Sequence, residues 1–392
     1  MDVRAILLTG VPPEAGTDSP TAGAGTSEQF SGKPFVVLPV LGQPLVQRIA
    51  DRLTQCGIDS VTVLNAADPS LPLIQEARRS DLKWKDTSAD QVWRAAEDEF
   101  HELVQAGAEL VILIRLGAYS EIEIDPLLQF HLDRRNHTTQ VVAGEGPVDF
   151  FVLSGSRRND AAFLLRSKLT RMRLQTQPFI FDGYVNRLRN SADLRRLVVD
   201  SLMLKTRIQP AGQQIRPGIW IGSGARVDRS VRLVAPCYIG AHARVRAGSL
   251  ITRGSSLEHH ATVDCGTVIE ASTVLPLSYV GAGLDVMHSV VGLKRIASIR
   301  YSAELAVEDK TLVSELPATS ALRTLAHAAN LITFLPRQMV QNFRARKLRE
   351  SQVVTECSPV EFDPGAVSRP VAKDRQTLTP SVVAGMREYG NQ

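Results

Sequence analysis

The sequence has few cysteines and no long hydrophobic segment. Its four cysteines, Cys56, Cys237, Cys265 and Cys357, lie far apart in 392 residues, and none stands in a CxxC pair. This spacing disfavours a zinc site and favours a reducing compartment. The apolar run at the N-terminus ends at Gly10 and is too short for a signal peptide or a membrane-spanning helix. We therefore expect a cytoplasmic protein.

The chain also lacks a large excess of charge of one sign. Its formal net charge is +4, from 45 basic and 41 acidic residues spread along the sequence. A balance so small gives no argument for a nucleic-acid partner. The hydrophobic share of 44% and the charged share of 22% are typical of a soluble globular protein, and the length suffices for two domains with separate cores.

Residues 1–209 alternate between strand-like and helix-like patterns. Short apolar runs at residues 5–8, 61–64, 110–114 and 140–143 predict buried strands. Helices are predicted between them from apolar residues at helical spacing and from capping residues, with Gly57 ending the first helix and Ser88 with Gln91, Asp125 and Ser191 starting later ones. Strands alternating with helices indicate an α/β domain with a mostly parallel sheet, covered on both faces.

From residue 210 to residue 300 the period changes to six. Small or thin residues precede most of the aliphatic positions by two, as expected for one face of a triangular coil of parallel strands. An antiparallel β-sandwich is the alternative, but its strands alternate with period two. The pattern therefore predicts a hexapeptide-repeat parallel β-helix whose interior is filled by Ile215, Ile221, Val227, Leu233, Ile239, Val245, Ile251, Leu257, Val263, Ile269 and Leu275.

Residues 301–350 are predicted to be a helical region. Apolar residues recur at helical spacing from Ala321 to Leu335, and five basic residues follow between Arg337 and Arg349. This amphipathic helix is expected to cap the β-helix, with a peripheral contact to a membrane surface as the alternative. Residues 351–392 lack periodicity and are expected to form a flexible tail.

Several segments resemble the sugar-1-phosphate nucleotidyltransferases, the NDP-sugar pyrophosphorylases that include mannose-1-phosphate guanylyltransferase. Residues 5–10 (AILLTG) resemble the opening strand and glycine of that family, and residues 38–45 (LPVLGQPL) are similar to its LPVLGKPL segment. Residues 121–131 resemble its TDIDLSALLxFH stretch, and residues 277–281 (LSYVG) its HLSYVGD element. The resemblance implies a Rossmann-like, GT-A-like domain joined to a left-handed β-helix.

The chemistry implied by the resemblance is nucleotidyl transfer, which needs cations and backbone amides around a triphosphate, and Mg²⁺ held by carboxylates. The resemblance assigns phosphate binding to Gly10, Gly16 and Thr17, but the position of the family's arginine is then Asp18. Lys33, followed by Pro34, is the candidate for the catalytic lysine, two residues from its expected place.

The metal-binding aspartate of the family falls on Gly117 in this sequence, and glycine has no side chain to bind Mg²⁺. Asp182, before Gly183, is a candidate for a second metal carboxylate, and a plain Asp-Gly turn is the alternative. Bifunctional relatives use a β-helix histidine for acyl transfer, but its position here is Pro276. His259 and His260 are expected to face solvent, so acyl transfer is disfavoured.

We expect a nucleotidyltransferase-family protein of nucleotide-sugar or exopolysaccharide metabolism that has lost most of its catalytic set. It would bind a nucleotide or sugar phosphate as a regulatory or scaffold subunit, as a homo-oligomer or with a partner enzyme. An active transferase that uses Mg²⁺ is one alternative. A purely structural β-helix oligomer is the other.

Overall fold

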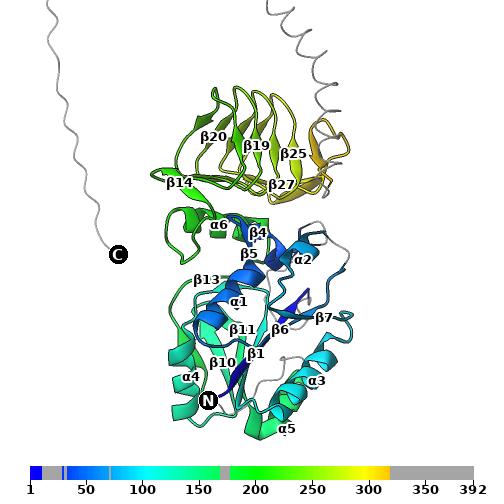
Figure 1. The fold of residues 1–392 in the computed structure, drawn as a ribbon, viewed down its shortest axis with the longest axis vertical. Helices are drawn as coiled ribbons and strands as arrows, with labels where there is room; N and C mark the ends of the chain where they lie inside the picture. The colour runs from blue at the N-terminus through cyan, green and yellow to red at the C-terminus, as the bar shows by residue number, and fades with distance from the viewer. Residues whose placement is uncertain (11–28, 31–32, 70–71, 168–176, 318–392) are drawn as a thin grey trace, which may run out of the picture. The chain divides into compact units, whose positions relative to one another are not determined.

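The computed structural model describes residues 1–10, 29–30, 33–69, 72–167 and 177–317, all within one compact unit, Met1–Asn330. Its first part is built around a seven-stranded sheet with helices on both faces (Figure 1). The strand order is β12-β10-β11-β8-β1-β6-β7. The bounds are β1 (Val3–Thr9), β6 (Val61–Asn65), β7 (Lys83–Asp86), β8 (Leu110–Arg115), β10 (Thr138–Ala143), β11 (Gly146–Ser154) and β12 (Phe179–Phe181).

The pairing confirms a parallel-rich α/β sheet with one exception. Strand β11 is antiparallel to both of its neighbours, because it returns from β10 through a tight hairpin. All the other pairs in this sheet are parallel. The carboxyl ends of β1, β6, β8, β10 and β12 therefore lie along one edge of the sheet.

Helices cover both faces of the sheet, and successive side chains of β1 point to opposite faces. Ala5 and Leu7 pack in one cluster with α1 and α4, whereas Ile6 and Leu8 pack in a second cluster with α3 and α5. The bounds are α1 (Leu45–Gln55), α2 (Pro72–Ala77), α3 (Val92–Gln105), α4 (Ile124–Asp133), α5 (Arg158–Arg166) and α6 (Ser191–Leu202), with the 3-10 turns η1 (Phe35–Val37) and η2 (Gly155–Arg157).

The predicted helix caps are only partly correct. Gly57 has a φ of 79° just after α1, and the Ile58 amide bonds back to the Leu53 carbonyl, as expected for a glycine C-cap. Helix α6 is capped by Asn190 instead of Ser191, since the Asn190 side chain accepts from the Asp193 amide at 2.9 Å. Helix α3 has no side-chain cap, so the predicted capping box is wrong.

Three short pairs of strands lie outside the main sheet. Each is a separate two-stranded antiparallel pair. They are β2 (Gln29–Phe30) with β3 (Lys33–Pro34), β4 (Pro39–Val40) with β5 (Gln43–Pro44), and β9 (Tyr119–Ser120) with β13 (Val185–Asn186).

The second part is a stack of parallel strands from Ile219 to Gly292, called the coil below, and it is compatible with a β-helix. The chain visits three sheets in turn and returns to the first after each round (Figure 1). The first sheet holds β15 (Ile219–Ile221), β18 (Cys237–Ile239), β21 (Ser255–Leu257), β24 (Thr273–Val274) and β27 (Ser289–Gly292). The second holds β16 (Arg226–Val227), β19 (Arg244–Val245), β22 (Thr262–Val263) and β25 (Ser278–Val280), and the third β17 (Arg232–Leu233), β20 (Leu250–Thr252), β23 (Val268–Glu270) and β26 (Asp285–Met287).

The register confirms the predicted interior positions from Ile221 to Ile269 and corrects the two outermost ones. Ile215 lies on β14 (Gln213–Arg216), which pairs antiparallel with β15, and its side chain is 49% exposed. Leu257 pairs with Val274, so that turn of the coil is one residue shorter than the preceding turns. Val274 therefore fills the interior, and Leu275 faces the core of the α/β part.

Residues 295–317 contribute three strands, and two of them lie where a helical region was predicted to begin. β28 (Arg295–Ser298), β29 (Ala303–Ala306) and β30 (Val313–Glu315) pair antiparallel at the last turn of the coil. The helix predicted from Ala321 to Leu335 and the predicted tail lie outside the described residues. Within the described residues, no helix has the length and apolarity needed to cross a bilayer.

The register predicts which isoleucines stabilise the coil. Ile251 is fully buried in its interior, so Ile251→Ala should lower the free energy of unfolding by about 2–5 kcal/mol, as for other buried large-to-small changes. The same substitution at the exposed Ile215 should change it by less than about 0.5 kcal/mol. Urea denaturation followed by circular dichroism measures both. Equal losses for the two variants would contradict the register.

Candidate functional site

The carboxyl edge of the main sheet is the first candidate, because open parallel sheets bind ligands there. Gly10 follows β1 and packs tightly on the loop after β6: a Cβ at Gly10 would lie 2.6 Å from the Ala67 amide nitrogen. The Asn65 side chain fixes that loop, since it donates to the Ala67 carbonyl and to Asp86, both at 2.9 Å. This part of the edge is formed by close backbone packing.

The end of β8 carries a cation where nucleotidyl transfer needs a metal carboxylate. Arg115 forms an ion pair with Asp149 on the neighbouring strand β11, and both side chains are partly buried. Gly117, two residues later, is buried, and its amide donates to the Arg115 carbonyl. The Asp149 carboxylate is therefore engaged by an arginine, and position 117 offers no ligand atom from a side chain.

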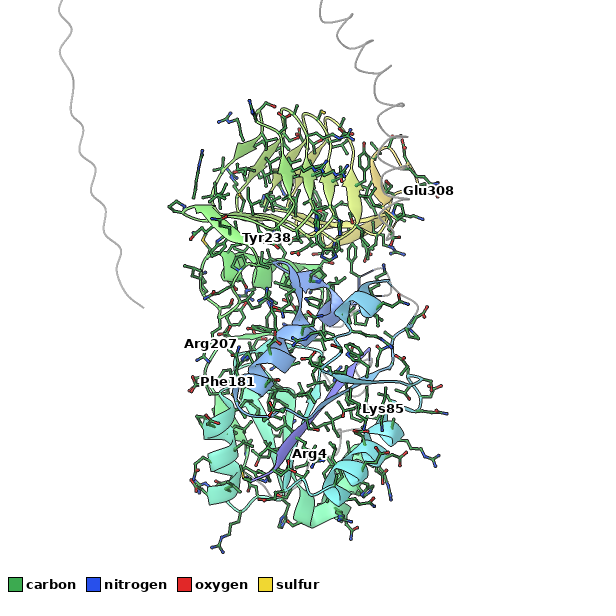
Figure 2. All side chains as sticks on the ribbon, in the orientation of Figure 1. Arg4, Lys85, Phe181, Arg207, Tyr238 and Glu308 are labelled. Carbon is green, nitrogen blue, oxygen red and sulfur yellow. The ribbon has the colours of Figure 1, made fainter. Side chains whose placement is uncertain are left out.

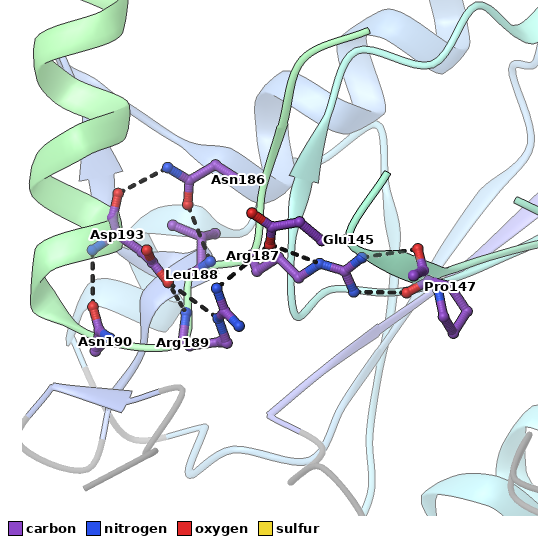
Figure 3. Close-up of polar contacts among 9 residues, drawn as sticks. Glu145, Pro147, Asn186, Arg187, Leu188, Arg189, Asn190 and Asp193 are labelled. Carbon is purple, nitrogen blue, oxygen red and sulfur yellow. Dashed lines mark hydrogen bonds and ion pairs between the residues drawn. The ribbon is translucent and has the colours of Figure 1, made fainter. Parts of the chain in front are cut away.

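A second group of charges surrounds the hairpin between β10 and β11 (Figure 3). Arg187 donates to the carbonyls of Pro147 at 2.7 Å and Gly146 at 2.8 Å, and its Nε lies 3.8 Å from Glu145. Arg189 lies 3.6 Å from the same Glu145 carboxylate and also contacts Asp193 on α6. The arginines thus tie the segment before α6 to the hairpin.

These contacts leave the edge close to electrical neutrality. Arg115, Arg187 and Arg189 each have an acidic partner within 4 Å. A triphosphate would have to displace Asp149 or Glu145 from these cations before it could bind them. The arrangement is therefore poorly suited to the charge of a nucleoside triphosphate with its metal.

The described site residues predicted from the sequence do not come together. Lys33 is buried, and its ammonium lies 3.6 Å from Glu315 on β30, at the last turn of the coil. Asp182 is exposed and follows β12, four strand positions from β1 and Gly10. That separation is roughly 19 Å at the usual strand spacing. Gly16 and Thr17 lie outside the described residues.

The donor set does not fit the Mg²⁺ that the resemblance implies. Among the described residues, no group of three or more histidine, cysteine, aspartate or glutamate side chains is arranged to hold a metal ion. Mg²⁺ requires several oxygen ligands, whereas Gly117 supplies none from a side chain and Asp149 is paired with Arg115. Asp182 as a metal ligand stays a prediction.

The histidines of the coil stack at one corner. The rings of His242 and His260 lie parallel with centroids 5.0 Å apart, and His259 packs edge-on against His260 at 5.8 Å. His259 and His260 are half-buried, so their predicted exposure is only partial. Pro276 is buried and has no group that could act as a base.

A contact that the sequence analysis missed joins the coil to the α/β part. Glu258, on the turn after β21, is fully buried, and its two carboxylate oxygens accept from the amides of Leu41 and Gly42, each at 2.9 Å. Arg48 on α1 donates to the carbonyls of Val40 and Leu41 at 2.9 and 3.2 Å. The segment 38–45, similar to the LPVLGKPL motif, is thus held from both sides.

The geometry of this loop depends on its close approach to the coil. Leu41 and Gly42 both have a positive φ, of 54° and 93°, which is costly for leucine. A Cβ at Gly42 would lie 2.3 Å from the hydroxyl of Tyr238 on β18. Tyr238 lies where the coil meets the α/β part (Figure 2). One signal in the sequence was available: Gly222 and Gly240 hold the equivalent positions in the preceding turns, so an acid at position 258 breaks a column of glycines.

Burial dominates the protonation of Glu258. Removal of its carboxyl from water raises its pKa from the ordinary 4.5 to about 7, although His259, the two amides and Arg48 act in the opposite direction. The proton is therefore held more tightly in the folded protein than in the unfolded chain.

Comparison with known proteins adds no relative. No family model matches the chain, and no curated protein sequence matches it. Any assignment of function therefore depends on the motifs in the sequence and on the geometry described above.

The pKa of Glu258 predicts how stability changes with pH. Because its folded pKa is the higher one, its contribution to stability is complete below about pH 4.5 and is lost as the pH rises through about 7. The loss should be of the order of 3 kcal/mol. Urea denaturation at several pH values should show this loss in the wild type, and Glu258→Gln should lack it.

Glu270→Gln is the matched control, since Glu270 pairs with the exposed Arg253. It should retain the wild-type dependence on pH. Parallel curves for wild type and Glu258→Gln would show that Glu258 does not hold the extra proton.

Proposed function

We propose that this chain is a catalytically degenerate relative of the sugar-1-phosphate nucleotidyltransferases, with a left-handed β-helix as its second part. It binds a nucleotide or sugar phosphate at the carboxyl edge of the main sheet and acts as a regulatory or scaffold subunit in nucleotide-sugar or exopolysaccharide metabolism. The observation that carries the proposal is the ion pair between Arg115 and Asp149, next to Gly117.

This ion pair bears on catalysis more directly than on binding. Transfer of a nucleotidyl group needs a metal and cations that stabilise charge as it develops on the triphosphate. Arg115 is directed to Asp149, and position 117 has no carboxylate. Phosphate binding at Gly10, which the resemblance implies, would need backbone amides of the kind that glycine-containing loops supply and no metal carboxylate. The edge therefore supports recognition of a phosphorylated ligand better than its conversion.

The rigid connection to the coil supports a scaffold role. Glu258 holds the loop at Leu41 and Gly42, and Arg195 on α6 is buried against the coil, where it donates to the carbonyl of Ala271 at 2.9 Å. Burial without a carboxylate partner lowers the pKa of Arg195 to about 10. Two elements of the α/β part are thus joined to the coil by buried polar groups, as expected for a unit that presents one fixed surface.

An assay of pyrophosphate release separates the proposed function from its alternatives. The purified chain, given Mg²⁺, each nucleoside triphosphate and a set of sugar 1-phosphates, should release no pyrophosphate above the background. The melting temperature should rise with at least one of these ligands, by about 2–4 °C at ten times its Kd. Turnover of any pair would favour an active transferase, and Lys33→Ala should then abolish it. Absence of both turnover and stabilisation would favour a structural module.

The ion pair at the sheet edge predicts a gain in affinity. Asp149→Asn removes the carboxylate of the ion pair with Arg115, so a phosphate that contacts the guanidinium no longer has to displace that charge. The affinity for the stabilising ligand should rise about tenfold, which corresponds to one charge-assisted hydrogen bond. Isothermal titration calorimetry measures the change.

Glu97→Gln is the matched control. It breaks the ion pair between Glu97 on α3 and the exposed Arg166 on α5, and it changes the net charge equally. Its affinity should equal that of the wild type. Weaker binding by Asp149→Asn would show that Asp149 itself contacts the ligand, contrary to the proposal.

A further inference from the structure

The two ends of the coil are closed differently. At its last turn, β28 and β29 continue the first sheet and β30 pairs with β25 of the second. At its first turn, β14 covers the edge of the first sheet only. In the described part of the chain, β16 and β17 each have a single neighbour, so two of the three sheets begin with an open edge.

The interior of the coil is partly exposed at this first turn. The three interior residues of the first turn are only half-buried: Ile221, Val227 and Leu233. Their counterparts one turn later are buried: Ile239, Val245 and Ile251. A stack of repeats needs a terminal cap to cover its apolar interior. The first turn of this coil carries no such cap among the described residues over β16 and β17.

The open edges also present backbone hydrogen-bonding groups. The amides of Arg226 and Asp228 donate to carbonyls of the second turn, and those of Arg232 and Val234 do the same on the third sheet. Backbone groups of alternate residues in a strand point in opposite directions. The amides of the intervening residues in β16 and β17 are therefore directed away from the coil, toward the open side.

The rim of this end carries charge of one sign. Residues 213–253 contain seven arginines and one acidic residue, Asp228. Arg226, Arg229 and Arg232 are exposed, and Arg226 and Arg232 form no ion pair with any described residue. Arg226 also stands in register with Arg244 on the next strand. An acidic partner would compensate the charges of Arg226 and Arg232.

We propose that the first turn of the coil binds an acidic, extended segment of a partner protein. The segment continues the path of the coil beside β16 and β17, with its backbone on the open edges, its apolar residues over Val227 and Leu233 and its carboxylates on Arg226 and Arg232. Eight residues suffice, the number from Arg226 to Leu233. A second copy of this chain is disfavoured because it would bring arginine against arginine. This goes beyond the proposed function, since ligand binding at the main sheet does not require it.

The test uses the full chain and a fluorescein-labelled eight-residue peptide of alternating glutamate and valine. Fluorescence anisotropy should show saturable binding that weakens as salt is added. The double variant Arg226→Glu/Arg232→Glu should weaken binding at least about tenfold, whereas Arg94→Glu/Arg158→Glu, an equal change on α3 and α5, should not. Val227→Pro removes one outward amide and should weaken binding several-fold, because proline is tolerated where the amide faces solvent.

Five outcomes would overturn the proposal. The first four are no binding of the peptide, equal binding of a peptide with lysine in place of glutamate, full retention of binding by the folded Val227→Pro variant, and self-association in sedimentation that Arg226→Glu abolishes. The fifth is competition by heparin together with equal binding of heparin to Val227→Pro and to the wild type. That result would indicate a general polyanion site. If Val227→Pro does not fold by circular dichroism, the arginine variants and the lysine peptide decide.

Discussion

The burial of one carboxylate between the two parts of the chain determines most of the remaining geometry. Glu258 lies on a rigid turn of the coil and accepts from two successive amides, Leu41 and Gly42, that hold left-handed backbone conformations. Those conformations persist only where the surroundings impose them. Helix α1 begins directly after this loop and packs on the main sheet. Glu258 therefore joins the loop before α1 to the coil, at the cost of withdrawing a charged group from water.

The fold was predictable where it depends on periodicity and unpredictable where it depends on register. The hexad identified the interior positions from Ile221 to Ile269 because each is apolar and each turn has the same length. Leu275 and Val274 are both apolar, so composition alone cannot tell which of them points inward once a turn is one residue shorter. The same ambiguity hid the role of Leu275, which joins the coil to the core of the α/β part.

The candidate site was likewise predictable only in part. That Gly117 cannot bind a metal follows from the sequence, because glycine has no side chain. That Arg115 is paired with Asp149, 34 residues away, could not be predicted, since it requires β11 to return antiparallel beside β8. Lys33 matched a motif by type, but its ammonium lies next to Glu315, almost three hundred residues later. Chemistry that depends on residue type is readable from sequence, whereas partners that depend on strand order are not.

The carboxyl edge of the main sheet and the first turn of the coil differ in how their arginines are paired. At the edge of the main sheet the arginines are paired with acids within 4 Å, so little positive charge extends toward solvent. At the first turn of the coil, exposed arginines outnumber acids and two of them have no acidic partner among the described residues. Unpaired surface charge acts over about a Debye length and steers partners of opposite sign. Although the net charge is small, the positive charge that lacks an acidic partner among the described residues is therefore concentrated at the first turn of the coil, and a phosphorylated ligand at the sheet edge would depend more on backbone amides than on free cations.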